Sequence, residues 1–510
     1  MKRSLRTDVA PPGATAAAGE AAGPSRGWSL GSARAVGAVT AALVAIHVRL
    51  QGRVRGPWLT DEVAYLRGAQ VFTGGSPPLL NDLPYYRWGY SLLLAPVEAL
   101  PLAPSTRFGV VTVVNAVLLA AVYPLVRALL VRVTQANAWQ ASLGALVAAL
   151  QPVVWVYGGF ALSEPLLLAL VPAWLLTVHA SARDGRPSVW FVATTLGLYA
   201  THDRLVVCLV PAAWLLVDLA RRPEGDRRRV IVTAAALGVG LIVVGLIDRW
   251  MVAVRWASVA EPQSDEGGAL SLVGDPSRWG DVAGRGIGHL WQLVVSGGVP
   301  LVVAVAVAVA ETRRRARRPG PGSPGEVAAA TVVRSAVVLL GGLLLASVVF
   351  LALAGTRADH FVYGRYAEIA LPPVVGLGMV AILLRADRVV AAAWATAGLV
   401  VVTGVGLAAL PWTSPVRAER VAVLHAPSLA LLTDGTGPLN IAMASGVAVG
   451  LAAMVGFGIH LRGGSDRTSR RRGTAIVALW VVSLVALDLA RSAHVLDEGE
   501  REHARAVAER

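Results

Sequence analysis

Long apolar runs recur from about residue 35 to residue 490, and they limit the possible folds more than any other feature of the sequence. A helix needs about 20 apolar residues to cross the roughly 30 Å hydrocarbon layer. Segments such as 301–310 and 332–350 are continuously apolar, which excludes the alternating pattern of a membrane barrel. With 55% hydrophobic and 15% charged residues, the chain also carries too much apolar surface for a water-soluble protein. The sequence therefore predicts an all-α, polytopic integral membrane protein.

We expect a bundle of about 11 to 13 transmembrane helices joined by short loops. The expected spans are 35–50, 107–131, 138–157, 163–180, 188–201, 204–219, 229–248, 287–310, 331–354, 367–384, 389–410, 440–461 and 474–491. The first run is predicted to be a retained signal anchor, because no small-residue cleavage site accompanies it. The single cysteine, Cys208, lies within a span and excludes an intramolecular disulfide.

The connecting segments alternate in charge. One set of segments holds Arg127 and Arg132, Arg183 and Arg186, Arg221 to Arg229, the run 313–318, Arg385 and Arg388, and Arg462 to Arg472. By the positive-inside rule this set is cytoplasmic, together with the basic N-terminus at Lys2, Arg3 and Arg6. The alternation predicts a multi-pass plasma-membrane protein. It also accounts for the net charge of +14 by topology rather than by a nucleic-acid partner.

The first outward-facing loop carries a carboxylate pair, Asp61 and Glu62, followed by Tyr65. In one interpretation the pair begins an interfacial helix, with its charge against the helix dipole and Thr60 as the cap. In the other, one carboxylate acts as a general base toward an acceptor hydroxyl. The sequence leaves both open.

Two further outward turns are polar. Glu164 begins the fourth span, where it either caps the helix or faces the bundle interior as a functional carboxylate. His202, Asp203 and Arg204 lie between the fifth and sixth spans, where they form either an internal ion pair or an anion-binding group.

A fourth outward cluster precedes the tenth span and combines Arg357, His360, Arg365 and Tyr366. Arginine matches phosphate oxygens with its planar fork of donors, and tyrosine adds hydrogen bonds or stacking beneath a sugar ring. The alternative is a solvated turn with an aromatic belt. A metal site is weakly supported, since no fixed ligand spacing surrounds His360. The requirement for a divalent cation stays open.

The order and shared sidedness of these motifs resemble GT-C glycosyltransferases. The resemblance is to the group similar to protein O-mannosyltransferases and aminoarabinose lipid A transferases, and it spans about residues 35–385. In family terms Asp61 matches the first-loop catalytic acid, with Glu62 as neighbour or substitute, and Arg365 with Tyr366 matches the motif near the donor phosphate. Glu164 and Arg204 correspond more loosely, because Thr201 to Arg204 departs from the family's usual turn.

The resemblance implies a sugar donor linked to a polyprenyl phosphate, and a lipid, glycan or other hydroxyl acceptor at the extracytoplasmic face. It implies an inverting reaction, with Asp61 as base and with Arg365, aided by His360, Arg204 or Arg357, against the leaving phosphate. Residues 1–30 are rich in Ala, Gly and Pro and are predicted to form a disordered cytoplasmic tail. The expected domains that follow are a GT-C-like catalytic membrane module (31–385), C-terminal membrane helices (386–495) and a polar tail (496–510).

Two other functions fit the same topology. A transporter or a flippase of lipid-linked glycans would place ionisable residues near the membrane midplane, whereas most lie here at predicted helix ends. A noncatalytic scaffold would tolerate substitution of Asp61 and Arg365.

Overall fold

The computed structural model describes residues 30–51, 56–57, 59–75, 85–222, 226–255, 275–317, 323–353, 358–384, 386–409, 426, 429 and 440–462. Every regular element in these ranges is a helix. The predicted N-terminal tail up to residue 29, the span at 474–491, the polar C-terminal tail and Arg357 lie outside the described residues.

The first half of the chain forms α1 (Leu30–Gln51), α2 (Thr60–Phe72), α3 (Gly89–Glu98), α4 (Pro104–Val133), α5 (Ala138–Ala149), α6 (Pro152–Val156), η1 (Tyr157–Gly159), α7 (Glu164–Asp184), α8 (Val189–Thr201), η2 (Asp203–Cys208), α9 (Leu209–Arg221) and α10 (Arg227–Arg255). The second half forms η3 (Pro276–Arg278), α12 (Trp279–Arg317), α13 (Pro324–Leu353), η4 (Ala358–Phe361), η5 (Glu368–Ala370), α14 (Leu371–Leu384), α15 (Ala386–Ala409) and α18 (Ile441–Arg462).

Eight of these helices are long and apolar enough to cross a membrane, or nine if the bent pair formed by α5 with α6 and η1 counts as one span. The remaining predicted spans in the described part of the chain correspond to shorter helices: α8, η2 with α9, and η5 with α14. The all-helical, polytopic fold class is thus confirmed, although fewer helices meet the length criterion than the 11 to 13 predicted.

Two elements differ from the predicted spans because of local backbone chemistry. The expected span at 138–157 bends by 60° between α5 and α6, where Pro152 follows Gln151. The span at 287–310 lies within the longer α12, whose helical geometry breaks at Gly298 with φ +54°. Glycine tolerates this left-handed conformation and Pro300 two residues later removes a helical hydrogen bond, so the chain turns there.

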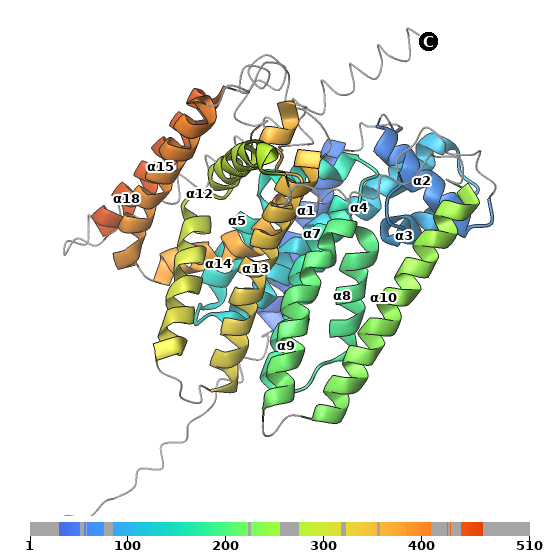
Figure 1. The fold of residues 1–510 in the computed structure, drawn as a ribbon, viewed down its shortest axis with the longest axis horizontal. Coiled ribbons are helices and arrows are strands. Elements are labelled where there is room, and N and C mark those ends of the chain that lie inside the picture. Colours follow the sequence, from blue (N-terminus) through green and yellow to red (C-terminus); the bar gives the residue numbers. More distant parts are fainter. Residues whose placement is uncertain are drawn as a thin grey trace, which may run out of the picture.

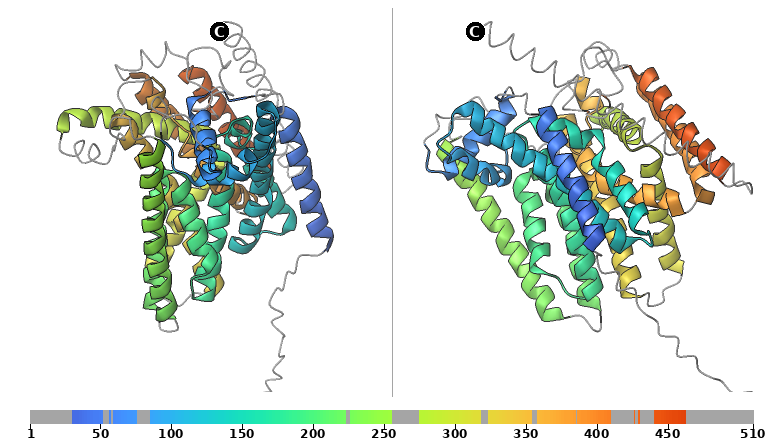
Figure 2. Two further views of the ribbon diagram at one scale, coloured as in Figure 1. Left: turned by 90° about the vertical axis from the view of Figure 1, so that its right-hand side faces the viewer. Right: turned by 180° about the vertical axis from the view of Figure 1, so that it is seen from behind.

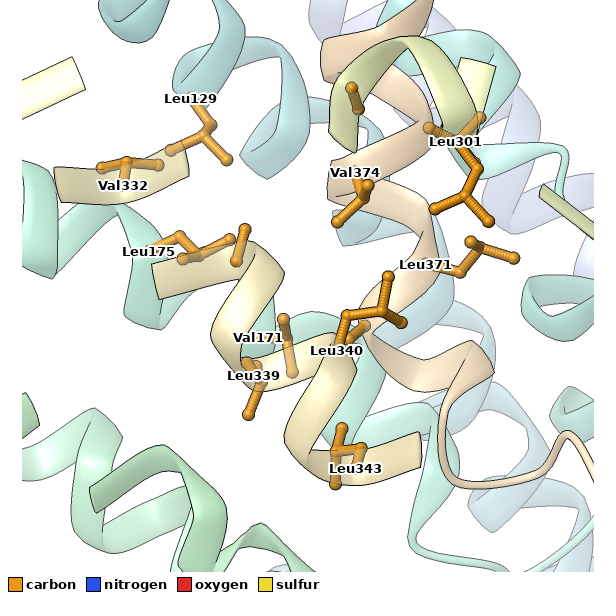
Figure 3. Packing of buried hydrophobic residues seen from close by; sticks show 14 of the residues in the cluster. Leu129, Val171, Leu175, Leu301, Val332, Leu339, Leu340, Leu343, Leu371 and Val374 are labelled. Carbon is orange, nitrogen blue, oxygen red and sulfur yellow. The ribbon is translucent and has the colours of Figure 1, made fainter. Parts of the chain in front are cut away.

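The helices pack around a shared apolar core (Figures 1 and 3). Leu129 of α4, Val171 and Leu175 of α7 and the α13 residues Val332 and Leu340 meet in this core. Large apolar side chains are also exposed on the outside of the bundle, as on α10, where Ile231, Val239, Ile242 and Leu246 are exposed. An apolar exterior over an apolar interior is the arrangement that hydrocarbon favours.

The two ends of the bundle differ. In Figure 1, α2, α3 and the C-terminal end of α10 lie at the top, while the turn from α9 to α10, the end of α12 and the start of α13 lie at the bottom. Figure 2 shows α1 along the outside of the bundle. The bottom end carries part of the arginine-rich set, including Arg227 to Arg229 and Arg313 to Arg314.

Candidate active site

Four chain segments that the sequence analysis treated separately meet at one place. They contribute Asp61 in the first turn of α2, Glu164 at the start of α7, Arg204 in η2, and Arg365 between η4 and η5. Both carboxylates stand at helix N-termini, where the macrodipole favours negative charge. The fold therefore gathers one residue from each of the four predicted polar clusters.

Arg365 joins the two carboxylates. Its Nη1 donates to Asp61 Oδ2 at 3.0 Å, and its Nε donates to Glu164 Oε1. The side chain of Asp61 keeps 21% of its surface exposed, against 7% for Arg365 and 1% for Glu164. Burial acts to lower the pKa of the Arg365 guanidinium, but the adjacent Glu164 carboxylate outweighs it and holds that pKa well above its ordinary value. Asp61 is therefore the member of this triad that a substrate reaches most readily.

Glu62 has a different environment from Asp61. Its side chain is fully buried, and its carboxylate accepts hydrogen bonds from the backbone N–H groups of Ala161 at 2.8 Å and Leu59 at 3.1 Å. The Leu59 bond caps α2, which begins at Thr60, so Thr60 is not the cap that the sequence suggested. Both Glu62 oxygens accept hydrogen bonds from backbone N–H groups and hold the two segments together.

Tyr65 helps to fix the same two loops. Its hydroxyl donates to Ser163 Oγ at 2.9 Å, next to Glu164 in sequence. Its ring stacks on Tyr86 with centroids 5.1 Å apart and meets Tyr90 edge-on at 5.3 Å. Tyr65 thus links α2 to the start of α7.

Arg204 packs on the ring of Tyr366, the residue that follows Arg365. Its guanidinium carbon is 3.7 Å from the centre of the Tyr366 ring, and that of Arg365 is 6.0 Å from the same centre. Nε and Nη1 of Arg204 are buried, and neither has a hydrogen-bond partner among the described residues. A cation packed on an aromatic face with unused donors is suited to an anionic ligand.

His202 and Asp203 orient this turn. His202 Nδ1 lies 2.6 Å from Asp203 Oδ1, and the Arg204 backbone N–H donates to the same oxygen at 2.7 Å. The His202 ring also meets the Tyr366 ring edge-on, 4.9 Å between centroids. The internal pair, one of the two alternatives that the sequence left open, is therefore present, and the anion-binding role of His202 and Arg204 remains a prediction.

Two tyrosine hydroxyls near the triad, those of Tyr86 and Tyr363, remain protonated. Burial raises the pKa of the Tyr86 phenol and of the Tyr363 phenol well above the ordinary value. Tyr363 donates to the Tyr366 hydroxyl at 3.4 Å. The site thus holds neutral phenols that can donate to a ligand oxygen near neutral pH.

The segment that carries Arg365 is supported by α12. His289 Nε2 donates to the His360 backbone carbonyl at 2.9 Å, and Ser296 Oγ donates to Glu368 Oε1 at 2.8 Å. Gln292 Nε2 donates to the same Glu368 oxygen. These contacts fix His360 against α12, and its predicted role toward a phosphate remains a prediction.

The sequence analysis missed a second polar group near this end, formed by Asp248 of α10 with Tyr85 and Arg87. Tyr85 donates to Asp248 Oδ1 at 2.6 Å, and Arg87 Nη1 lies 3.7 Å from Asp248 Oδ2. The Arg87 guanidinium also stacks on Tyr199 of α8 at 3.8 Å. A carboxylate at the end of the apolar run 229–248 was the feature that could have revealed this group.

Nothing in the described part of the chain forms a metal site. No group of three or more His, Cys, Asp or Glu side chains there is arranged to hold a metal ion. The carboxylates nearest each other in the site are already neutralised by Arg365. A requirement for a divalent cation therefore remains untested.

The structure is thus that of an all-helical polytopic membrane protein. Four separate chain segments contribute the charged side chains of its ion-paired cluster. Solved structures of similar fold include the arabinosyltransferase EmbB from Mycobacterium smegmatis, at 13% identity and a TM-score of 0.48 over 90% of this chain and 41% of that chain. This chain therefore spans about two fifths of the EmbB chain.

ArnT from Cupriavidus metallidurans is also similar, in two states. Its apo state shows 15% identity and a TM-score of 0.44 over 92% of this chain and 78% of that chain. Its undecaprenyl phosphate-bound state shows 14% identity and a TM-score of 0.42 over 91% and 77% of the respective chains. No family model and no curated protein matches the sequence. The likeness is one of helix arrangement.

Proposed function

We propose that this protein is a membrane glycosyltransferase that moves a sugar from a polyprenyl-phosphate donor to an acceptor hydroxyl at the extracytoplasmic face. The observation that carries the proposal is the pairing of Asp61 with Arg365 beside Arg204, which has unused donors. A carboxylate can activate the acceptor hydroxyl and a cation with free donors can stabilise the leaving phosphate, so the two groups serve both partners of a displacement at an anomeric carbon.

In this mechanism Asp61 takes the proton of the acceptor hydroxyl. The acceptor oxygen attacks the anomeric carbon, the bond from that carbon to the phosphate oxygen breaks, and the polyprenyl phosphate leaves with the electron pair. Attack opposite to the leaving group inverts the configuration. Asp61 suits the base because it is the more exposed carboxylate of the triad and because its contact with Arg365 Nη1 fixes its position.

Arg204 is the group best placed to bind the leaving phosphate. Arg365 uses Nε and Nη1 on carboxylates, whereas Nε and Nη1 of Arg204 have no partner among the described residues. Donors already oriented toward developing charge stabilise a transition state without reorganisation. Arg365 then orients Asp61, and its charge adds to the field that favours the phosphate.

The distribution of charge supports an extracytoplasmic site. The arginine-rich ends of α10 and α12 lie at the bottom of Figure 1, and α2, which carries Asp61, lies at the top. The positive-inside rule assigns the basic end to the cytoplasm. The site then faces the opposite side, where a donor in the outer leaflet would meet its acceptor.

The test is transfer of radiolabelled sugar from a panel of polyprenyl-phosphate sugars by purified protein in nanodiscs. We expect Asp61→Asn to lower the transfer rate by about 10²- to 10⁴-fold, the usual range for loss of a general base. Donor affinity should change far less. Arg204→Ala should lower both affinity and rate.

Asp218→Asn is the matched control, because Asp218 pairs with Arg222 on α9 outside the site. Thermal unfolding of each variant separates a lost catalytic group from a lost fold. Unchanged transfer in both site variants would contradict the proposal. Movement of lipid-linked sugar across vesicles without transfer would instead favour a flippase.

A further inference from the structure

Glu164 has one carboxylate oxygen that the protein leaves unused. Oε1 accepts from Arg365 Nε, whereas Oε2 is buried and has no hydrogen-bond partner among the described residues. The side chain is only 1% exposed, so bulk water does not satisfy that oxygen. A buried ionised acceptor without a donor costs free energy, and a ligand that brings a donor would remove this cost.

The same cluster contains unused groups of the opposite kind. Arg204 Nε and Nη1 are buried donors without an acceptor in the described part of the chain. The Tyr366 ring is near both arginines, with its centre 3.7 Å from the Arg204 guanidinium carbon and 6.0 Å from that of Arg365. One ligand that satisfies both must carry hydroxyl donors as well as anionic oxygens. A sugar joined to a phosphate has this chemistry.

The backbone around Glu164 is held firmly enough to select among hydroxyl positions. Ser163 is tied to Tyr65 of α2, and the Ala161 N–H is tied to Glu62 of the same helix. Pro165 follows at the start of α7, where its fixed φ suits the first helical turn. A rigid buried acceptor discriminates strongly between ligands with and without the matching hydroxyl.

We propose that Glu164 binds a hydroxyl of the donor sugar through Oε2 and thereby determines which sugar the protein accepts. This inference rests on the proposed function, because it assigns the sugar end of the same donor whose phosphate meets Arg204. Glu164 is a specificity residue in this arrangement and takes no proton, since Arg365 Nε holds its other oxygen.

The test compares the affinity of the full-length protein in nanodiscs for undecaprenyl phosphate and for its glucosyl, mannosyl and arabinosyl derivatives. For the wild type, we expect one sugar to strengthen binding at least about tenfold over undecaprenyl phosphate alone. In Glu164→Gln this gain should shrink to about twofold or less, because the amide can place its NH₂ where the carboxylate oxygen stood. Affinity for undecaprenyl phosphate itself should stay within about threefold.

Glu98→Gln is the matched control, since Glu98 is also a largely buried carboxylate paired with an arginine, Arg107, but outside the site. It should keep the full gain from the sugar. A deoxy derivative of the preferred sugar that lacks the hydroxyl reached by Glu164 should bind wild type and Glu164→Gln equally.

Three outcomes would overturn the inference. A gain that persists in Glu164→Gln means that another group binds the sugar. An equal loss for undecaprenyl phosphate and for all its derivatives means that Glu164 only supports the fold. If the wild type transfers sugar but binds the sugar-linked lipid no more tightly than undecaprenyl phosphate, the inference fails and the proposed function stands. If the wild type neither binds nor transfers any of these lipids, the proposed function fails as well.

Discussion

At the scale of single residues, the site is organised by one guanidinium that serves two carboxylates. Arg365 donates to Glu164 through Nε and to Asp61 through Nη1. Asp61 is the most exposed member of this triad, and Glu164 is almost fully buried. Arg204, stacked on Tyr366, is a separate cation in the same cluster.

The residue types of this site could be predicted from the sequence, but their contacts could not. Asp61 and Arg365 are separated by 304 positions, and only their expected placement on one membrane face linked them. The sequence could not assign different roles to the neighbours Asp61 and Glu62, since each is an acidic residue in the first turn of a helix. Their different environments arise from two distant segments, since the one between η4 and η5 brings Arg365 to Asp61 and the one before α7 brings the Ala161 N–H to Glu62.

Glu62 provides the residue-scale prediction. In Glu62→Gln the amide NH₂ must face one of the two backbone N–H groups that the carboxylate now accepts from, and one buried donor loses its acceptor. We expect the variant to be less stable by about 1–3 kcal/mol, which thermal unfolding in nanodiscs would detect.

Transfer per folded molecule by Glu62→Gln should stay well above that of Asp61→Asn. Abolished transfer with unchanged stability would reverse the roles of the two carboxylates.

At the scale of elements, side chains of neighbouring helices form hydrogen bonds with backbone carbonyl groups that lie outside regular helix at membrane depth. Between α5 and α7 the chain passes through α6 and η1, and its backbone groups need partners where lipid offers none. Gln51 of α1 donates to the Trp155 carbonyl, and Asn115 of α4 donates to the Phe160 carbonyl. Pro152 marked this break in the sequence, but the partners of the freed carbonyls emerge only from the fold.

The first half of α12 is the element that positions the Arg365 segment. Hydrogen bonds join His289 to the His360 carbonyl, and Ser296 to Glu368. Gly288 lets the two backbones approach, because a Cβ there would meet the Phe361 carbonyl oxygen. An apolar span was expected at 287–310, so the polar face of this half helix was not recognised in the sequence.

Gly288→Ala is the element-scale prediction. The added methyl group must displace η4 or α12, so Arg365 moves relative to Asp61. We expect transfer to fall by about 10²-fold, since small misplacements of catalytic groups have effects of this size.

Gly286→Ala is the matched control, because a Cβ at Gly286 meets nothing within 4 Å. Gly286→Ala should leave the transfer rate unchanged and raise the free energy of unfolding by about 0.5–1 kcal/mol, because alanine favours the helix more than glycine does. Equal activities of the two variants, measured with the same donor, would show that the approach at Gly288 does not position the site.

At the scale of the whole molecule, the sequence predicted the arrangement better than it predicted any single contact. Twelve of the thirteen expected spans coincide with a helix or a helix pair in the described residues, and the remaining one lies outside them. Apolar run length and loop charge are local properties, so they can be read from sequence directly. The bend at Pro152 and the break at Gly298 arise from single residues within apolar runs, which run length and loop charge do not register.

Orientation in the membrane gives the last prediction. Thr73, at the end of α2, is exposed on the same helix as Asp61, and Gln135, between α4 and α5, is exposed at the far end of α4. Because α4 has 30 residues, its ends lie about 45 Å apart, more than the thickness of the hydrocarbon layer. Thr73 and Gln135 should therefore face opposite sides.

The buried Cys208 is the only cysteine, so Cys208→Ser provides a background without thiols. In that background Thr73→Cys should react with a membrane-impermeant maleimide in intact cells, whereas Gln135→Cys should react only after permeabilisation. The opposite pattern would place Asp61 and Arg365 on the cytoplasmic side. A donor in the outer leaflet would then be out of reach, and the arginine-rich end of the bundle would contradict the positive-inside rule.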